Sequence, residues 1–107
     1  MEIPVIIKSN YMDLKNLLFK DSKRVELPLN SVLSYKDADA DLSGFETQVI
    51  LEVEAEANST EAIEPVSNYL YNKMKDLDNV EISINEKEVD LTEEDIKRGL
   101  MKAYYKN

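Results

Sequence analysis

The most regular pattern of apolar and polar positions in this chain covers residues 45–57, FETQVILEVEAEA. Apolar side chains occupy most of the odd positions, and polar side chains occupy every even position except Ile50. A period of two is typical of a β-strand with one face in the core and the other in water. Because a half-apolar strand is not stable alone, we expect this strand to pack against helices or a second sheet.

Three further patterns precede this central strand. Residues 3–7 form a short β-branched run, and Pro4 restricts that run to a sheet edge or to the first residues of a strand. Residues 11–20 carry apolar side chains at spacings of three and four, which predicts a helix. Alternation over residues 25–35 predicts one interrupted strand or two short ones, with Pro28 at an unpaired edge.

A helix and a hairpin are predicted after the central strand. Apolar residues recur at helical spacing over residues 65–77, with Pro65 expected at the first helical position. Residues 80–91 alternate on both sides of a tight turn, which predicts a hairpin.

The last helix has the strongest local signals in the sequence. Thr92 can cap its N-terminus together with Asp95 three residues later, in a variant of the capping box. Acidic residues fill its first turn and basic residues follow, which suits the helix dipole. Gly99 is expected to weaken the helix slightly.

The predicted order of elements is strand, helix, two or three strands, helix, hairpin and helix. This order indicates an α+β fold, a mainly antiparallel sheet of about five strands with about three helices packed on one face. The length of 107 residues fits a single domain, residues 1–107. If the strands at 45–57 and 80–84 run parallel in one sheet, the helical connection between them should be right-handed.

The composition excludes most familiar catalytic and metal-binding chemistry. The chain has no cysteine and no histidine, so it lacks thiol nucleophiles, zinc–thiolate sites and the usual general base. It also lacks the nucleophile-elbow, phosphate-loop and dinucleotide-binding motifs. We therefore expect a non-enzymatic protein with no catalytic residue, no metal and no cofactor. The apolar run at the start is too short for a signal peptide or a membrane span, which favours a cytoplasmic protein.

The net charge of −9 is concentrated in one segment of the chain. Residues 37–64 contain nine acids and no Lys or Arg, whereas the other 13 acids are balanced by the 13 bases of the chain. Such a surface repels nucleic acid and anionic membranes, so we expect neither as a direct partner. It would instead attract the basic surface of another protein.

The candidate binding surface consists of acids in the loop and strand at the start of this segment. These acids are Asp37, Asp39, Asp41, Glu46, Glu52, Glu54 and Glu56. Strand residues two apart are separated by about 6.6 Å, so Glu52, Glu54 and Glu56 would repeat at an interval close to that of successive phosphates in a nucleic acid. A second interpretation is that the acids only solvate the strand and discourage sheet aggregation.

Part of the acidic loop resembles the start of a calcium-binding loop. Asp37, Asp39 and Asp41 match the D-x-D-x-D opening of an EF-hand. The sixth position of that loop is Leu42 where glycine is needed, and the twelfth is Gln48 where glutamate is needed. The match therefore fails, and we interpret the segment as a solvated acidic loop.

These patterns predict a small acidic binding protein that engages a basic site on a partner protein. If that site normally holds DNA or RNA, the protein would inhibit its partner by mimicking a nucleic acid, as a phage or mobile-element protein could. The alternative is a structural or assembly subunit that forms a homo-oligomer through a strand edge near Pro4 or Pro28, or through the last helix. In that case the acids serve only solubility.

Overall fold

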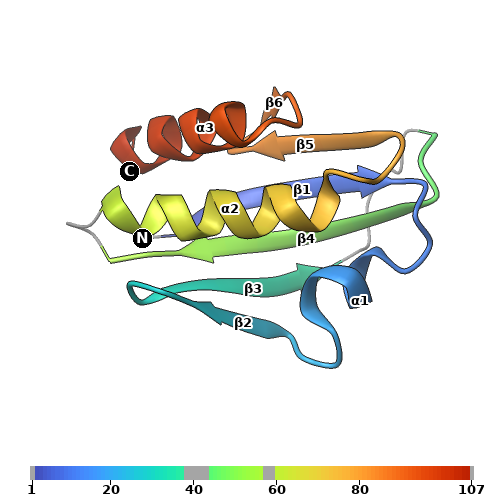
Figure 1. Ribbon diagram of the computed structural model, residues 1–107, viewed down its shortest axis with the longest axis horizontal. Helices are drawn as coiled ribbons and strands as arrows, with labels where there is room; N and C mark the ends of the chain where they lie inside the picture. The colour runs from blue at the N-terminus through green and yellow to red at the C-terminus, as the bar shows by residue number, and fades with distance from the viewer. Residues whose placement is uncertain (1, 38–43, 57–59, 107) are drawn as a thin grey trace.

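The computed structural model describes residues 2–37, 44–56 and 60–106 (Figure 1). In chain order its elements are β1 (Glu2–Ser9), α1 (Leu14–Phe19), β2 (Arg24–Leu27), β3 (Ser31–Asp37), β4 (Thr47–Glu54), the 3-10 turn η1 (Thr60–Ala62), α2 (Ile63–Met74), β5 (Val80–Ile84), β6 (Lys87–Val89) and α3 (Glu93–Lys106). The predicted α+β fold is confirmed. Its antiparallel sheet has six strands among the described residues, one more than expected, and three helices accompany it.

The first strand of the chain lies near the middle of the sheet, in the strand order β2-β3-β4-β1-β5-β6. β1 pairs with β4 along its whole length, but with β5 only from Val5 to Ser9. Pro4 therefore lies in an inner strand, just outside the part that β5 covers. Its carbonyl accepts a hydrogen bond from the Asn85 N–H beyond the end of β5, at 2.9 Å. Because the N and C=O of one strand residue point to the same neighbour, the missing N–H of Pro4 removes no bond to β4.

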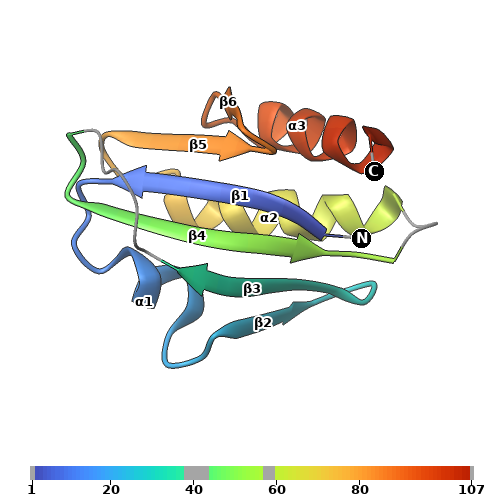
Figure 2. The same cartoon turned by 180° about the vertical axis from the view of Figure 1, so that it is seen from behind.

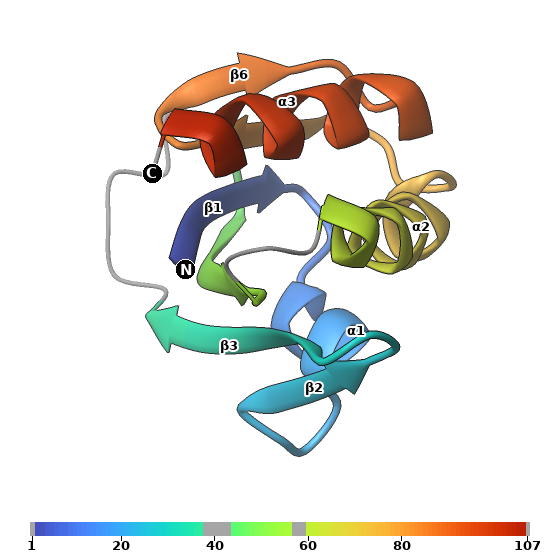
Figure 3. The ribbon, with the colours of Figure 1, turned by 90° about the vertical axis from the view of Figure 1, so that its left-hand side faces the viewer.

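The three helices form a layer on one side of the sheet, as the sequence predicted. Figure 1 shows α2 in front of β1 and β4, and Figure 2 shows the same strands from behind with no helix in front of them. Viewed from one end, α2 lies to one side of β1, and α3 runs next to β6, above β1 (Figure 3). β4 and β5 both pair antiparallel with β1 and so run parallel to each other. Their connection through α2 is right-handed (Figure 1), as expected.

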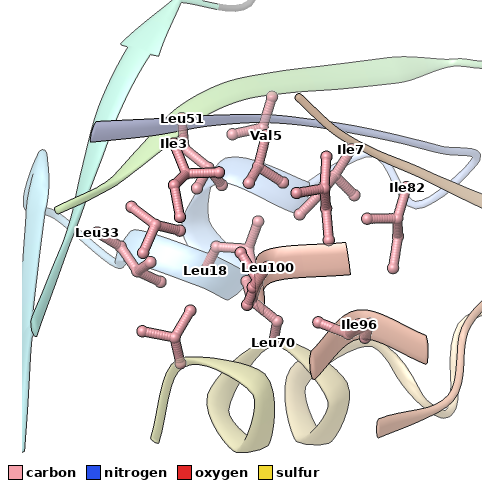
Figure 4. Close-up of a cluster of buried hydrophobic side chains, with 14 of the residues drawn as sticks. Ile3, Val5, Ile7, Leu18, Leu33, Leu51, Leu70, Ile82, Ile96 and Leu100 are labelled. Carbon is pink, nitrogen blue, oxygen red and sulfur yellow. The ribbon is translucent and has the colours of Figure 1, made fainter. Parts of the chain in front are cut away.

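The core lies between the sheet and this layer of helices (Figure 4). It contains fully buried aliphatic side chains from both layers, among them Ile3, Val5, Ile7, Leu33 and Leu51 from strands and Leu18, Leu70, Ile96 and Leu100 from helices. Burying one such side chain contributes about 1.5–3 kcal/mol. The strand residues in this set are odd-numbered, so the predicted buried face of the central strand is confirmed.

β4 is shorter than the predicted strand at residues 45–57. Glu46 precedes it and Glu56 follows it, so neither belongs to the paired strand. Gln48 differs from the expectation for a solvated position, because it is only 4% exposed. Its register partner on β1 is Lys8.

Two prolines occupy positions other than those predicted. Pro65 is the third residue of α2 instead of the first, but it is still in the first turn, where backbone N–H groups have no partner in the helix. Pro28 lies in the turn between β2 and β3, whose central residues Leu29 and Asn30 both have positive φ. The interval 25–35 thus forms two strands, which was one of the two possibilities.

Local capping fixes the start of α3 as predicted. The Asp95 N–H donates to Thr92 Oγ1 at 3.0 Å, and Thr92 Oγ1 donates to Asp95 Oδ2 at 2.9 Å. The Ile96 N–H then donates to the Thr92 carbonyl at 3.0 Å, which is the first helical bond. Capping of this kind satisfies backbone donors that the helix itself cannot.

Candidate acidic interface on the open face of the sheet

The face of the sheet that points away from the helices is the candidate site, and we call it the open face (Figure 2). Its side chains alternate with those of the core, and in the two inner strands they are Glu2, Pro4, Ile6 and Lys8 of β1 and Gln48, Ile50, Glu52 and Glu54 of β4. Apart from Gln48, these residues are exposed or half-buried. The open face therefore combines a small apolar centre with charged groups around it.

Three carboxylates meet at one end of the inner strands. Glu2 of β1 stands directly opposite Glu54 of β4, and Glu52 is the diagonal neighbour of Glu2 in the same register. Diagonal neighbours lie within reach of long side chains. We call Glu2, Glu52 and Glu54 the acid cluster.

Glu52 is the electrostatic centre of this cluster. Burial raises the pKa of its carboxyl, and a hydrogen bond to Glu2 and the negative charge of Glu2 raise that pKa further. Glu54 acts in the same direction, whereas Lys36 lowers the pKa. The Lys36 ammonium lies 3.8 Å from Glu52 Oε2, which is too far for a hydrogen bond. This buried oxygen accepts no hydrogen bond from any residue that the structure describes. Ionised Glu52 is therefore only partly compensated by its surroundings.

Neutral donors hold the two acids that follow along the chain. The Ser34 hydroxyl donates to Glu54 Oε2 at 3.2 Å, and the Asn30 side-chain amide donates to Glu56 Oε1 at 3.0 Å. Such bonds orient a carboxylate without neutralising its charge. Glu54 and Glu56 thus remain available to a cation from outside.

A shallow hollow of about 300 Å³ adjoins the acid cluster. Its lining consists of Glu2, Arg24, Asn30, Val32, Glu54, Ala55 and Glu56. Three carboxylates thus face one guanidinium, and the Arg24 Nε is itself 3.9 Å from Glu26 Oε1. The hollow is a negative concavity that suits a lysine or arginine side chain.

The structure brings together only some of the acids predicted for the site. Glu52, Glu54 and Glu56 lie at the same end of the sheet, next to Glu2. Glu46 is exposed at the opposite end of β4, where its N–H donates to Asn10 Oδ1 at 3.3 Å. It therefore lies apart from the acid cluster, because β4 residues 47–51 lie between Glu46 and Glu52.

Three of the predicted site residues are the aspartates at positions 37, 39 and 41. Asp37 is the last residue of β3, and the structure describes its backbone only. Asp39 and Asp41 lie outside the described residues.

Glu2 is the site residue that the sequence-based prediction missed. A signal for it was present, because Glu2, Pro4, Ile6 and Lys8 alternate with the buried Ile3, Val5 and Ile7. That alternation places Glu2 on a solvated strand face, but it does not reveal which strand lies beside it.

The described part of the chain contains neither a candidate metal site nor a membrane-spanning helix. No group of three acids in residues 2–37, 44–56 and 60–106 is arranged to hold a metal ion. No helix within the same ranges has the length and apolar character required to cross a membrane. No protein-family model, curated protein or solved structure matches this chain.

Proposed function

We propose that this protein binds a basic surface of a partner protein through the acid cluster and Glu56, and that it acts in the cytoplasm without catalysis. The observation that carries this proposal is the convergence of carboxylates from two neighbouring strands on a sheet face that no described helix covers. The hollow beside them supplies a place for a cationic side chain.

The electrostatics of Glu52 support this proposal. In the free protein its ionised carboxylate lies beside Glu2 and Glu54, and their mutual repulsion opposes the compact state. Lysine or arginine side chains of a partner would replace that repulsion with attraction. Binding should therefore be fast and should weaken as salt screens the charges.

We further propose that the partner site is one that normally holds DNA or RNA. Strand geometry separates Glu52 and Glu54 by about 6.6 Å, and Glu56 continues the series beyond the end of β4. Glu2 adds a fourth carboxylate across the strand pair. A protein with this surface would block its partner by occupying the basic groove, as an inhibitor from a phage or mobile element would.

The test is affinity capture from a low-GC bacterial lysate with two charge-matched triple variants. The first is Glu2→Gln, Glu52→Gln and Glu54→Gln on the open face. The second is Asp76→Asn, Asp78→Asn and Glu86→Gln, at exposed loop positions with the same change in net charge. We expect the native protein and the loop variant to retain a nucleic-acid-binding protein at low salt, and the open-face variant to lose it.

Two further measurements complete the test. A DNA or RNA oligonucleotide should displace the captured protein, because both ligands would compete for one groove. Circular dichroism must show that both variants are folded. Capture of the same partner by all three proteins, or no effect of salt, would contradict the proposal.

The free edge of β2 offers little support for the alternative of assembly through strand pairing. The Tyr35 N–H donates to the Lys23 carbonyl, so the main-chain groups of Arg24 point away from β3. The Ser22 hydroxyl accepts from the Arg24 N–H at 3.0 Å and donates to the Arg24 carbonyl at 2.8 Å. Pro28 has no N–H. Within β2, Glu26 is left as the only residue that offers both groups to another strand, which is a usual form of edge protection.

A further inference from the structure

Residues of the β5–β6 hairpin and α3 line a second concavity. These two elements lie side by side (Figures 1 and 3). The volume of this concavity is about 280 Å³, and none of its lining residues belongs to the open-face hollow. Its chemistry is also different, because basic and acidic side chains line it in equal number, together with apolar groups.

Gly99 shapes this cavity. Asp95, Arg98, Gly99 and Lys102 follow one another at helical spacing, so they form one stripe of α3 that faces the hairpin. A Cβ atom at Gly99 would lie 3.0 Å from Val89 Cγ1 and 3.1 Å from Ile84 Cδ1. The missing side chain lets the helix approach the hairpin closely and leaves an apolar floor.

The walls of the cavity carry cations. The register of β6 places Lys87 opposite Ile84 and Val89 opposite Ile82, on the helix side of the sheet. Glu88, opposite Ser83, belongs to the open face, although it borders the cavity at the strand edge. On α3, Arg98 Nη1 is paired with Asp95 Oδ1 at 3.0 Å, so these two charges compensate each other.

Two ammonium groups of the lining make no ion pair within the described residues. Lys87 and Lys102 both line the cavity, and neither makes an ion pair with any residue that the structure describes. Asp90 also borders the cavity, at its exposed rim. The lining holds three bases, Lys87, Arg98 and Lys102, and three acids, Glu88, Asp90 and Asp95, so the cavity is neutral in a protein whose net charge is −9.

We propose that this cavity binds a small organic acid with an apolar body. The carboxylate would lie between Lys87 and Lys102, and the hydrocarbon part would lie on Val89 and Gly99, above the buried Ile84. The volume is at the lower end of that of ligand pockets, which favours a ligand of few atoms. This site is independent of the acidic interface proposed above.

The experiment is an NMR titration of the 15N-labelled protein at constant ionic strength, with hexanoate as the probe. Hexanamide, a neutral amide of the same length, is the matched control ligand. We expect saturable shifts of amide signals at residues 84–90 and 95–103 with hexanoate, and binding of hexanamide weaker by about tenfold, since the amide lacks the charge that the lysines attract.

Paired variants locate the carboxylate. Lys87→Gln with Lys102→Gln should raise the Kd for hexanoate by about tenfold or more. Lys20→Gln with Lys75→Gln removes the same charge at exposed positions elsewhere and should leave the Kd unchanged. The same spectra report whether each variant is folded. The proposal is wrong if hexanoate gives no saturable shifts, if hexanamide binds equally well, or if both double variants weaken binding to the same extent.

Discussion

The two faces of the sheet have different environments, and neighbouring residues of β4 show the difference most directly. Leu51 is fully buried against the helix layer, whereas Ile50 and Glu52 on either side of it belong to the open face. All three residues belong to the same extended strand, so the difference between them lies in the environment of their side chains. The covered face accounts for most apolar burial, and the open face concentrates acids that destabilise one another. Mutual repulsion of these acids lowers stability, which is why we proposed the open face as an interaction surface.

The largest expected effect comes from adding a charge to each face. Leu51→Asp should unfold the protein, because an unpaired carboxylate in the core costs several kcal/mol, a large part of a typical stability of about 5–15 kcal/mol. Ile50→Asp should leave a cooperative transition, since that side chain is half-exposed. Thermal melting followed by circular dichroism distinguishes the two variants. A native-like melt of Leu51→Asp would show that the face assignment is inverted.

A smaller change in the free energy of unfolding is expected when a hydroxyl group is removed on each side of the sheet. Thr92→Ala should lower the free energy of unfolding by about 1 kcal/mol, because the Asp95 N–H loses its cap. Ser83→Ala on the open face should change it by less than about 0.5 kcal/mol, as is usual for such surface positions. Urea denaturation measures both values. Equal effects would mean that the cap of α3 contributes nothing specific.

The smallest change in stability is expected in the acid cluster, and there the substitution should stabilise the protein instead of destabilising it. Glu52→Gln should raise the urea midpoint at neutral pH, because it removes a partly buried carboxylate beside Glu2. The folded-state pKa of Glu52 is raised above the ordinary value of 4.5, so the folded protein holds this proton more tightly than the unfolded chain does. The contribution of Glu52 to the free energy of unfolding is therefore most favourable at low pH. It decreases as the pH rises from 4.5 through the raised pKa.

The pH dependence provides the measurement that checks this prediction. The gain in midpoint from Glu52→Gln should be small below pH 4.5 and largest above the raised pKa. Glu88→Gln, at an exposed position of the same face, is the control and should change the midpoint less. A gain that is the same at every pH would contradict the assignment to Glu52.

Much of the fold could be predicted because its signals are local. The alternation around Leu51, the hairpin near Asn85 and the cap at Thr92 each depend on residues a few positions apart. The acidic site was predicted less completely. Glu52, Glu54 and Glu56 follow from the alternation of one strand, but Glu46 is separated from them and Glu2 joins them from a strand at the start of the chain.

The sequence by itself determined the periodicity of each element, the caps of α3 and the sign of the net charge, since these depend on neighbouring residues and on composition. Only the tertiary structure decided that β1 lies inside the sheet, that Glu2 meets Glu52 and Glu54, and that Gly99 lets α3 reach the β5–β6 hairpin. The physical reason is that strand order, register and helix packing result from contacts between segments far apart in the chain. A local pattern shows which side of a strand or helix is apolar, but it does not show which other segment covers that side.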